Sequence, residues 1–300
     1  MWQTYLRPKT VDEALQALAE AGEAAVLIAG GTDLMLDLQQ GRHPPVQTLV
    51  DITEIPELRA LERRGGELFV GAGVPLNRVA ASPLVRAHAT ALAEATGQMA
   101  GHQVRNVATL GGNVAHALPA ADGAIALLAL DAQAEVASLE GRRRVPLADL
   151  YLGPGRSALR HGEVLVGFWV PLAQGVTASA FRRVMRPQGV ALPILNAAVW
   201  LARADGRIAH IRIAVGPFGP VPRRATAAEG VLCGRIPDDA ALDAALEALL
   251  REARFRTSRY RATETYRRHL AGILLRETVR QAWQRTEQAA DARGRAASDG

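Results

Sequence analysis

Two pairs of adjacent glycines are the residues in this chain best suited to hold a phosphorylated ligand. Gly30 and Gly31 follow a short apolar run, and Gly111 and Gly112 lie about eighty residues later. Because glycine has no Cβ, such a pair lets the backbone adopt positive φ and lets another molecule approach closely. Where a strand runs into the start of a helix, free N–H groups also attract a phosphate. The two pairs predict one diphosphate held from two sides, although plain structural turns would produce the same local pattern.

The residues that follow each pair add polar groups. Thr32 and Asp33 can cap a helix, and Asn113 can both donate and accept hydrogen bonds. Asp122 is the only formally charged residue in the range 109–123, and its carboxylate could bind a ribose hydroxyl, cap a helix, or do both. Neither pair lies in a G-x-G-x-x-G motif, and no glycine precedes a lysine, since the only lysine is Lys9. The usual dinucleotide and nucleoside-triphosphate motifs are therefore disfavoured.

The sequence around both pairs resembles one known family. Residues 29–33 read A-G-G-T-D and residues 104–113 read V-R-N-V-A-T-L-G-G-N, a combination similar to the FAD-binding medium subunit of molybdenum hydroxylases. That family includes the flavoprotein subunits of xanthine dehydrogenase-like enzymes and of aerobic carbon monoxide dehydrogenase. The resemblance covers nearly the whole chain, because further matching segments lie at residues 50–58, 119–122, 162–165 and 260–270.

The resemblance implies a set of cofactor-binding residues. Two loops would grip the diphosphate of FAD: Leu27, Ile28, Ala29, Gly30, Gly31, Thr32, Asp33 and Leu34 in the first, and Thr109, Leu110, Gly111, Gly112 and Asn113 in the second. Asp122 would face the adenosine, Leu165 would touch the ring system, and Arg182 would supply a basic group near the cofactor. Some family members carry a tyrosine near the flavin in the segment matching residues 189–191, where this chain has none. No acid–base catalytic residue and no metal ligand is assigned, because the redox chemistry belongs to the cofactor.

The fold that the resemblance implies is α+β. A two-lobed FAD-binding domain of the PCMH/VAO-like type would span residues 1–175, with a small α/β lobe at 1–57 and a larger α+β lobe at 58–175. A C-terminal α+β domain, similar to that of carbon monoxide dehydrogenase flavoproteins, would span residues 176–285 with a three-stranded sheet and helices. The polar residues 286–300 would form a flexible tail.

The hydrophobic pattern predicts the elements of this fold directly. Strands are expected at residues 2–6, 24–28, 48–52, 68–71, 135–138, 143–146 and 163–171. Phe168 and Trp169 should lie on opposite faces of the last of these strands. Three more strands are expected at 178–185, 195–202 and 207–215, with Asp205-Gly206 as a hairpin turn. Helices are expected at 10–21, 34–40, 83–96, 122–130, 225–233, 239–254 and 262–283.

Composition limits the other functions open to the chain. The formal net charge is +5, but aromatic residues make up only 4%, so no basic and aromatic stacking surface indicates nucleic-acid binding. The single cysteine, Cys233, cannot by itself form a disulfide, a cysteine-ligated zinc site or an iron–sulfur cluster. The first residues carry no apolar signal segment, and the longest apolar run, 124–130, is too short to cross a bilayer. We therefore expect a cytoplasmic protein with no transmembrane segment.

The family resemblance implies a role in electron transfer. The chain would hold FAD, receive electrons from a small [2Fe–2S] subunit beside a large molybdopterin-containing subunit, and reduce an external acceptor such as NAD, a quinone or oxygen. Arginine clusters at 142–144 and 251–268 are the surfaces we expect to dock on acidic partner subunits. The alternatives are a stand-alone FAD-dependent oxidoreductase of the same fold and a nucleotide-binding scaffold with no redox role.

Overall fold

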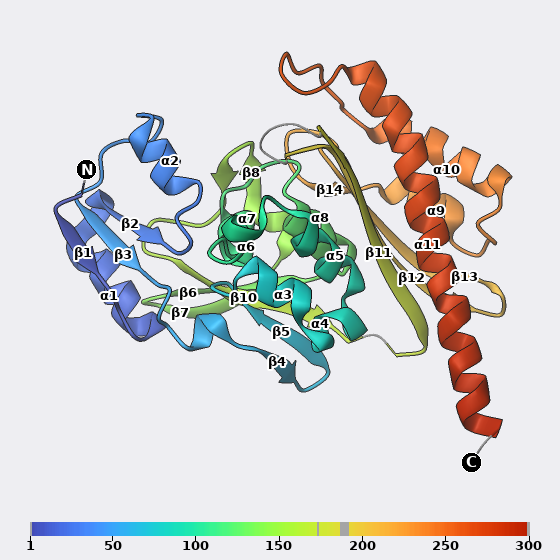
Figure 1. Cartoon of the computed structure of the whole chain (residues 1–300), viewed down its shortest axis with the longest axis horizontal. Helices are drawn as coiled ribbons and strands as arrows, with labels where there is room; N and C mark the ends of the chain where they lie inside the picture. The colour runs from blue at the N-terminus through green and yellow to red at the C-terminus, as the bar shows by residue number, and fades with distance from the viewer. Residues whose placement is uncertain (1, 173, 187–191, 299–300) are drawn as a thin grey trace.

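The structure is a computed structural model that describes residues 2–172, 174–186 and 192–298, with side chains described as far as residue 290. Its elements fall into three units that follow one another along the chain (Figure 1). The small N-terminal lobe lies at one end, the larger lobe occupies the centre, and the C-terminal sheet with its long last helix lies at the other end.

The small lobe is a parallel three-stranded sheet with one covering helix. Its strands lie in the order β1 (Thr4–Leu6), β3 (Thr48–Asp51) and β2 (Ala25–Ile28). Helix α1 (Val11–Ala21) begins as predicted, because the side chain of Thr10 accepts a hydrogen bond from the Glu13 N–H. The apolar face of α1 packs in one cluster with residues of the larger lobe, including Trp169. The second helix, α2 (Leu34–Gln39), is short and follows the first glycine pair.

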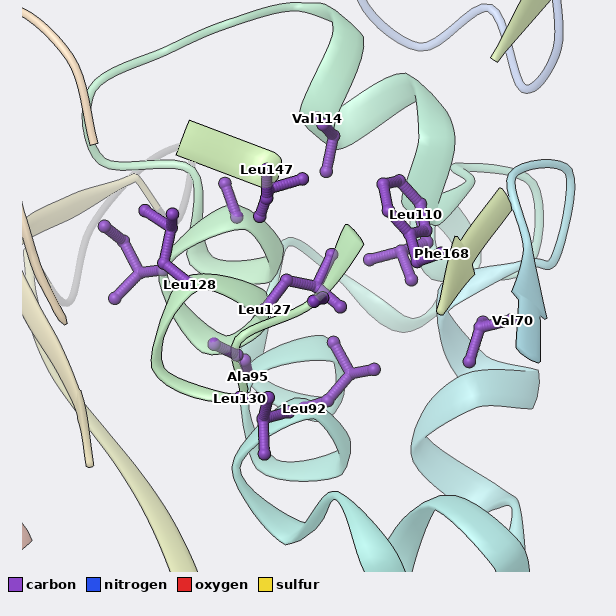
Figure 2. Packing of buried hydrophobic residues seen from close by; sticks show 14 of the residues in the cluster. Val70, Leu92, Ala95, Leu110, Val114, Leu127, Leu128, Leu130, Leu147 and Phe168 are labelled. Atoms are coloured by element: carbon purple, nitrogen blue, oxygen red, sulfur yellow. The ribbon is translucent and has the colours of Figure 1, made fainter. Parts of the chain in front are cut away.

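The larger lobe contains a five-stranded antiparallel sheet. Its strand order is β4 (Leu61–Arg64), β5 (Glu67–Gly71), β10 (Val164–Pro171), β6 (Gln133–Ser138) and β7 (Gly141–Pro146). Phe168 and Trp169 do lie on opposite faces of β10, since Trp169 packs toward α1 and Phe168 packs among the helices of this lobe. Figure 2 shows Phe168 beside Leu110, with Val114, Leu127 and Leu92 nearby in the same core.

The described part of the larger lobe also contains six α-helices: α3 (Leu76–Ala81), α4 (Pro83–His88), α5 (Thr90–Gln98), α6 (His102–Arg105), α7 (Leu110–Ala115) and α8 (Asp122–Ala129). A small hairpin of β8 (Tyr151–Gly153) and β9 (Arg156–Ser157) lies beside them. The prediction of one helix over 83–96 is wrong, because the chain leaves helical geometry at Ala89 (φ −141°, ψ 52°). The chain becomes helical again at the start of α5. A contact distant in sequence supports this second start, because the Ala91 N–H donates to Ser179 Oγ at 3.0 Å.

The C-terminal domain is an antiparallel sheet packed against three helices. Its strands are β11 (Val176–Met185), β12 (Pro193–Ala204), β13 (Arg207–Gly216) and a two-residue edge strand, β14 (Arg223–Arg224), which the sequence pattern did not predict. The hairpin between β12 and β13 turns at Asp205 and Gly206, both with positive φ (49° and 70°), as expected for Asp-Gly. The helices are α9 (Thr226–Leu232), α10 (Asp239–Glu252) and α11 (Glu264–Ser298).

Helix α11 does not end at residue 285, where the polar tail was expected to begin. Thr286 is fully buried, Arg285 donates to the Ser179 carbonyl at 2.6 Å, and Glu287 lies 3.2 Å from Arg203. Polar side chains that pair with the sheet therefore continue the helix beyond the last apolar residue. None of the helices in the described part of the chain is both long and apolar enough to span a membrane.

Candidate cofactor site

The structure brings the first glycine loop into direct contact with the residues that flank the second. Gly30 lies against the backbone of the segment before α7, because a Cβ on Gly30 would stand 2.1 Å from the Val107 carbonyl oxygen. A second contact lies at the end of α7, where His116 Nε2 is 3.9 Å from Asp33 Oδ1. Residues about eighty positions apart thus form one continuous surface, as the prediction of a diphosphate held from two sides requires.

The first loop exposes a row of backbone donors. Gly31 has a φ of +66°, a conformation that favours glycine. Within the described residues, the amide N–H groups of Gly30, Gly31, Thr32, Asp33 and Leu34 donate no hydrogen bond. These five residues are half-buried or exposed. Consecutive unpaired N–H groups form a concavity suited to an anion.

The second pair adopts a different geometry from the one predicted. Gly111 and Gly112 lie inside α7 and neither has positive φ. Gly111 is buried, its N–H donates to the Ala72 carbonyl at 2.8 Å, and an added Cβ would stand 2.5 Å from Ala72 Cβ. Gly112 is exposed, and its Cβ would meet only Thr109 Oγ1, at 3.2 Å. Gly111 thus lets α7 pack closely on Ala72, the residue that follows β5. Gly112 leaves the outer face of α7 open.

The segment before α7 is fixed by side chains of the R-N-V-A-T stretch. Arg105 Nη1 donates to the carbonyls of Met99 and Ala100, both at 2.7 Å, and Arg105 Nε donates to Asn77 Oδ1 at 2.9 Å. Thr109 then caps α7, because its Oγ1 accepts from the Gly112 N–H at 3.1 Å. The surface that meets Gly30 is therefore held rigidly before any ligand binds.

Several predicted site residues face the protein interior and support the loops. Ile28 packs in one cluster with Leu34, Leu27 and Ala29 pack with the α1 cluster, and Leu110 is buried in the central core. Asn113 also has a structural partner, since its Oδ1 accepts from the Gly123 N–H at 3.1 Å and so links α7 to the start of α8. Leu165 is buried in the core of the larger lobe.

Asp122 is the first residue of α8, and the structure does not support the predicted helix-capping role. The N-cap position is Ala121, and the Asp122 carboxylate instead pairs with Arg183 on β11 and accepts from Asn196 Nδ2 on β12 at 2.6 Å. Only 3% of Asp122 is exposed. Burial raises the pKa of Asp122 to about 6, although Arg183 and Asn196 act in the opposite direction. The ion pair joins the larger lobe to the C-terminal sheet.

Arg183, which the sequence analysis did not single out, is the basic residue that reaches Asp122. Side chains alternate between the faces of a strand, and Arg182 lies on the other face of β11, where its Nη1 is 3.5 Å from Glu277 on α11. The sequence analysis missed Arg183 and Asn196. The alternation of apolar and polar residues along β11 was the available signal for Arg183, whereas nothing local indicated Asn196. The segment 189–191, where the family tyrosine was sought, lies outside the described residues.

Asp122 should make the stability of the chain depend on pH between about 4 and 6. Because its pKa is raised in the folded chain above its ordinary 3.8, the folded state holds the proton more tightly than the unfolded state. The stabilisation that this pKa shift adds to the free energy of unfolding is therefore full below pH 4 and is lost as the pH rises through 6. We measure the free energy of unfolding of wild type and of Asp122→Asn by urea denaturation. The value for wild type minus the value for the variant should fall by up to about 3 kcal/mol from pH 4 to pH 7. A difference that stays constant or increases would contradict this assignment.

Two surface pockets in the described part of the chain lie away from the glycine loops. Two pockets flank Trp200 on the C-terminal sheet, one beside His88 and Arg285 and the other beside His210 and Cys233. No residue of either glycine loop lines them. The candidate site therefore rests on the loops' backbone donors and their mutual contact.

Comparison with known proteins identifies the family. Residues 2–173 match the FAD binding domain in molybdopterin dehydrogenase, and residues 179–282 match the CO dehydrogenase flavoprotein C-terminal domain. The carbon monoxide dehydrogenase medium chain of Hydrogenophaga pseudoflava is 33% identical, over 94% of this chain and 97% of its own. The xanthine dehydrogenase FAD-binding subunit of Escherichia coli O157:H7 is 30% identical, over 93% and 95%. The solved carbon monoxide dehydrogenase from Hydrogenophaga pseudoflava matches with a TM-score of 0.90 at 32% identity, over 95% of this chain and 98% of that chain.

The chain therefore belongs to the family of FAD-binding flavoprotein subunits of molybdenum hydroxylases. It is an oxidoreductase flavoprotein of the carbon monoxide dehydrogenase and xanthine dehydrogenase type, and its cofactor is FAD. These matches confirm the predicted fold class and the family resemblance. The five N–H groups of the first loop, which donate to no described residue, and the open face at Gly112 fit a group with a negatively charged diphosphate.

Proposed function

We propose that this chain is the electron-transfer subunit of a molybdenum hydroxylase complex, taking electrons from a [2Fe–2S] partner subunit and passing them to an external acceptor such as NAD, a quinone or oxygen. The observation that carries the proposal is the row of amides at residues 30–34, which donate to no residue in the described part of the chain, beside the segment that leads into α7. FAD supplies the redox chemistry when bound, because flavins take part in both one-electron and hydride transfer.

The chain's own residues would bind and orient the cofactor. The amides of the first loop would donate to the diphosphate, and Gly112 would let it approach the outer face of α7. Arg105 and Thr109 would hold that face in place through the hydrogen bonds described above. Asp122 and Arg183 would position the C-terminal sheet against the larger lobe, which makes them positioning residues in this proposal.

The partners follow from what the chain lacks and from its relatives. One cysteine in 300 residues cannot ligate an iron–sulfur cluster, so single electrons must arrive from another chain. Curated relatives carry names such as carbon monoxide dehydrogenase medium chain and nicotine 6-hydroxylase medium subunit. We therefore propose a large molybdopterin-containing subunit and a small [2Fe–2S] subunit as partners, in the cytoplasm.

Reconstitution tests this function. Purified alone, the chain should show the absorption bands of oxidised flavin but little turnover with substrates of such complexes. Co-expressed with its molybdopterin-containing and [2Fe–2S] subunits, it should elute with them as a heterotrimer or its dimer, and substrate should bleach the flavin bands. A chain that elutes alone beside those subunits, yet oxidises a substrate by itself, would be a stand-alone FAD-dependent oxidoreductase instead.

A further inference from the structure

The two arginine clusters of the sequence have different surroundings in the structure. In the cluster at 142–144, every guanidinium pairs with a carboxylate of this chain. Arg142 pairs with Glu57 and Glu135, Arg143 Nη1 lies 2.6 Å from Glu163, and Arg144 Nη1 lies 2.8 Å from Glu67. Arg144 also stacks on Trp169, with its Cζ 3.6 Å from the ring centroid. This cluster is neutralised internally and offers little free charge to a partner.

The second cluster, which we call the arginine segment, spans residues 251–268 and carries seven arginines and two glutamates. Within the described residues, only Arg268 has an acidic partner, Glu264, at 3.9 Å. The other glutamate, Glu252, accepts hydrogen bonds from the start of α9, at Thr226 and Ala227. The remaining six arginines therefore lack carboxylate partners among the residues that the structure describes.

The arginines of this segment also repel one another, and burial together with this repulsion lowers the pKa of two of them. Burial lowers the pKa of Arg261, and the nearby Arg256 lowers it further. Burial likewise lowers the pKa of Arg267, and both Arg256 and Arg261 add to that shift. Like charges held together in this way destabilise the free chain, and carboxylates from outside would relieve the repulsion.

The arginine segment is held in place by contacts with the domain. The Arg254 N–H donates to the Phe218 carbonyl at 2.8 Å, and Phe255 packs edge-on against Phe218. The buried Arg267 donates from Nη1 to the Arg256 carbonyl at 2.7 Å. In Figure 1 the connection between α10 and α11 projects at the upper edge of the molecule. A pre-organised segment loses less entropy on binding than a disordered one.

Apolar side chains lie exposed within and beside these arginines. Tyr260 is 73% exposed and lies between Arg259 and Arg261, and Tyr266 at the start of α11 is 44% exposed. Ile273 is 39% exposed and follows Tyr266 by two helical turns, on the same face of α11. Tyrosine and arginine are enriched at the centres of protein–protein interfaces, where they contribute most of the binding energy.

We propose that the arginine segment, together with Tyr260 and Tyr266, is the docking surface for an acidic face of a partner subunit in the hydroxylase complex. The inference rests on the proposed function, because it needs a partner subunit. Charge complementarity carries it: five exposed arginines of this surface have no carboxylate partner among the described residues, whereas the arginines at 142–144 are already paired. The exposed tyrosines and Ile273 favour a protein surface over a nucleic acid, which would be expected to meet a basic groove or stripe.

Charge reversal tests the docking surface. The double variant Arg256→Glu/Arg259→Glu changes two exposed arginines, and Arg63→Glu/Arg235→Glu is the matched control with the same charge change at exposed arginines elsewhere. Each form is co-expressed with the molybdopterin-containing and [2Fe–2S] subunits, and assembly is measured by light scattering after size exclusion and by molybdenum and iron per flavin. We expect the first variant to weaken assembly at least 100-fold and the control to assemble within about twofold of wild type. Both should retain wild-type FAD content.

The outcomes separate this inference from the proposed function. If wild type fails to assemble with either subunit, the proposed function is wrong and the docking surface with it. If wild type and the Arg256→Glu/Arg259→Glu variant assemble equally well, only the docking surface is wrong. Tyr260→Ala is the second variant, for use if the charge reversal lowers FAD content through misfolding, and it too should weaken assembly. Binding of a 20-nucleotide RNA or DNA by wild type at micromolar affinity, lost in the double variant, would assign the surface to nucleic acid and overturn the inference.

Discussion

Replacing Gly112 by aspartate should abolish FAD binding while leaving the fold intact. Gly112 is exposed on the outer face of α7, and its helical backbone accepts a side chain without strain. An added Cβ would stand 3.2 Å from Thr109 Oγ1 alone, so that hydroxyl would shift by a few tenths of an ångström and the carboxylate would point outward. A negative charge facing a diphosphate costs several kcal/mol, which corresponds to a dissociation constant raised on the order of 100-fold or more.

The measurement is a titration of the apoprotein with FAD, followed by flavin fluorescence. Gly66→Asp is the matched control, because Gly66 is exposed, has open space around its Cβ position and lies outside both loops. Circular dichroism should give the same melting temperature for wild type and Gly112→Asp within a few degrees. Full flavin occupancy in the Gly112→Asp variant would show that the diphosphate does not lie against α7.

The other glycines of the loops are less informative positions for substitution. Gly31→Asp should also prevent binding, but Gly31 has positive φ and a Cβ there would stand 3.1 Å from Ile28 and 3.2 Å from Met35. Gly111→Ala would bring a Cβ within 2.6 Å of the Ala72 carbonyl oxygen. Both changes should therefore disturb the apoprotein. Gly31 and Gly111 have structural roles, whereas the two pairs were predicted to bind the diphosphate.

Removing the Asp122 carboxylate should have the second largest effect, and it should act mainly on stability. In the Asp122–Arg183 pair, the side chains are 4% and 2% exposed. Breaking such a pair by deleting one partner typically costs about 3–5 kcal/mol, because the other charge stays buried. We therefore expect Asp122→Ala to lower the free energy of unfolding by about that amount in urea denaturation at pH 7.

Asp122→Asn should be milder than Asp122→Ala, because an amide oxygen can still accept a hydrogen bond from Asn196 or Arg183. Titration of both variants with FAD separates the two roles given to this residue. If Asp122 also contacts the adenosine, Asp122→Ala should weaken FAD by about 1–3 kcal/mol when measured well below the unfolding transition. Equal unfolding free energies for wild type and Asp122→Ala would contradict the structural role.

Much of this fold could be predicted because its signals are local. The Thr10–Glu13 capping box, the Asp205-Gly206 hairpin and the opposite faces of Phe168 and Trp169 each depend on neighbouring residues. The break at Ala89 could not be predicted in this way. The hydrogen bond that supports it runs from the Ala91 N–H to Ser179, which lies in another domain. The extension of α11 beyond residue 285 likewise depends on contacts of Arg285 and Glu287 with the sheet.

The same difference between local signals and contacts distant in sequence applies to the candidate site. The sequence motifs identified the two loops and the family, and these motifs are contiguous. They did not distinguish Gly111, which packs on Ala72, from Gly112, which faces outward. They also gave no indication that Arg183, next to Arg182, makes the buried pair with Asp122. Which of two adjacent residues faces a site depends on the register of the helix or strand against its neighbours, and that register is set by tertiary packing.

Hydrogen–deuterium exchange of the backbone amides, measured by mass spectrometry with and without FAD, tests the proposed site most directly. The amides of Gly30–Leu34 donate no hydrogen bond within the described chain, so they should exchange rapidly in the apoprotein. If they hold the diphosphate, FAD should slow their exchange strongly, and peptides that cover α7 should also become protected. Unchanged exchange at residues 30–34 in a chain saturated with FAD would contradict the site and require the diphosphate to bind elsewhere.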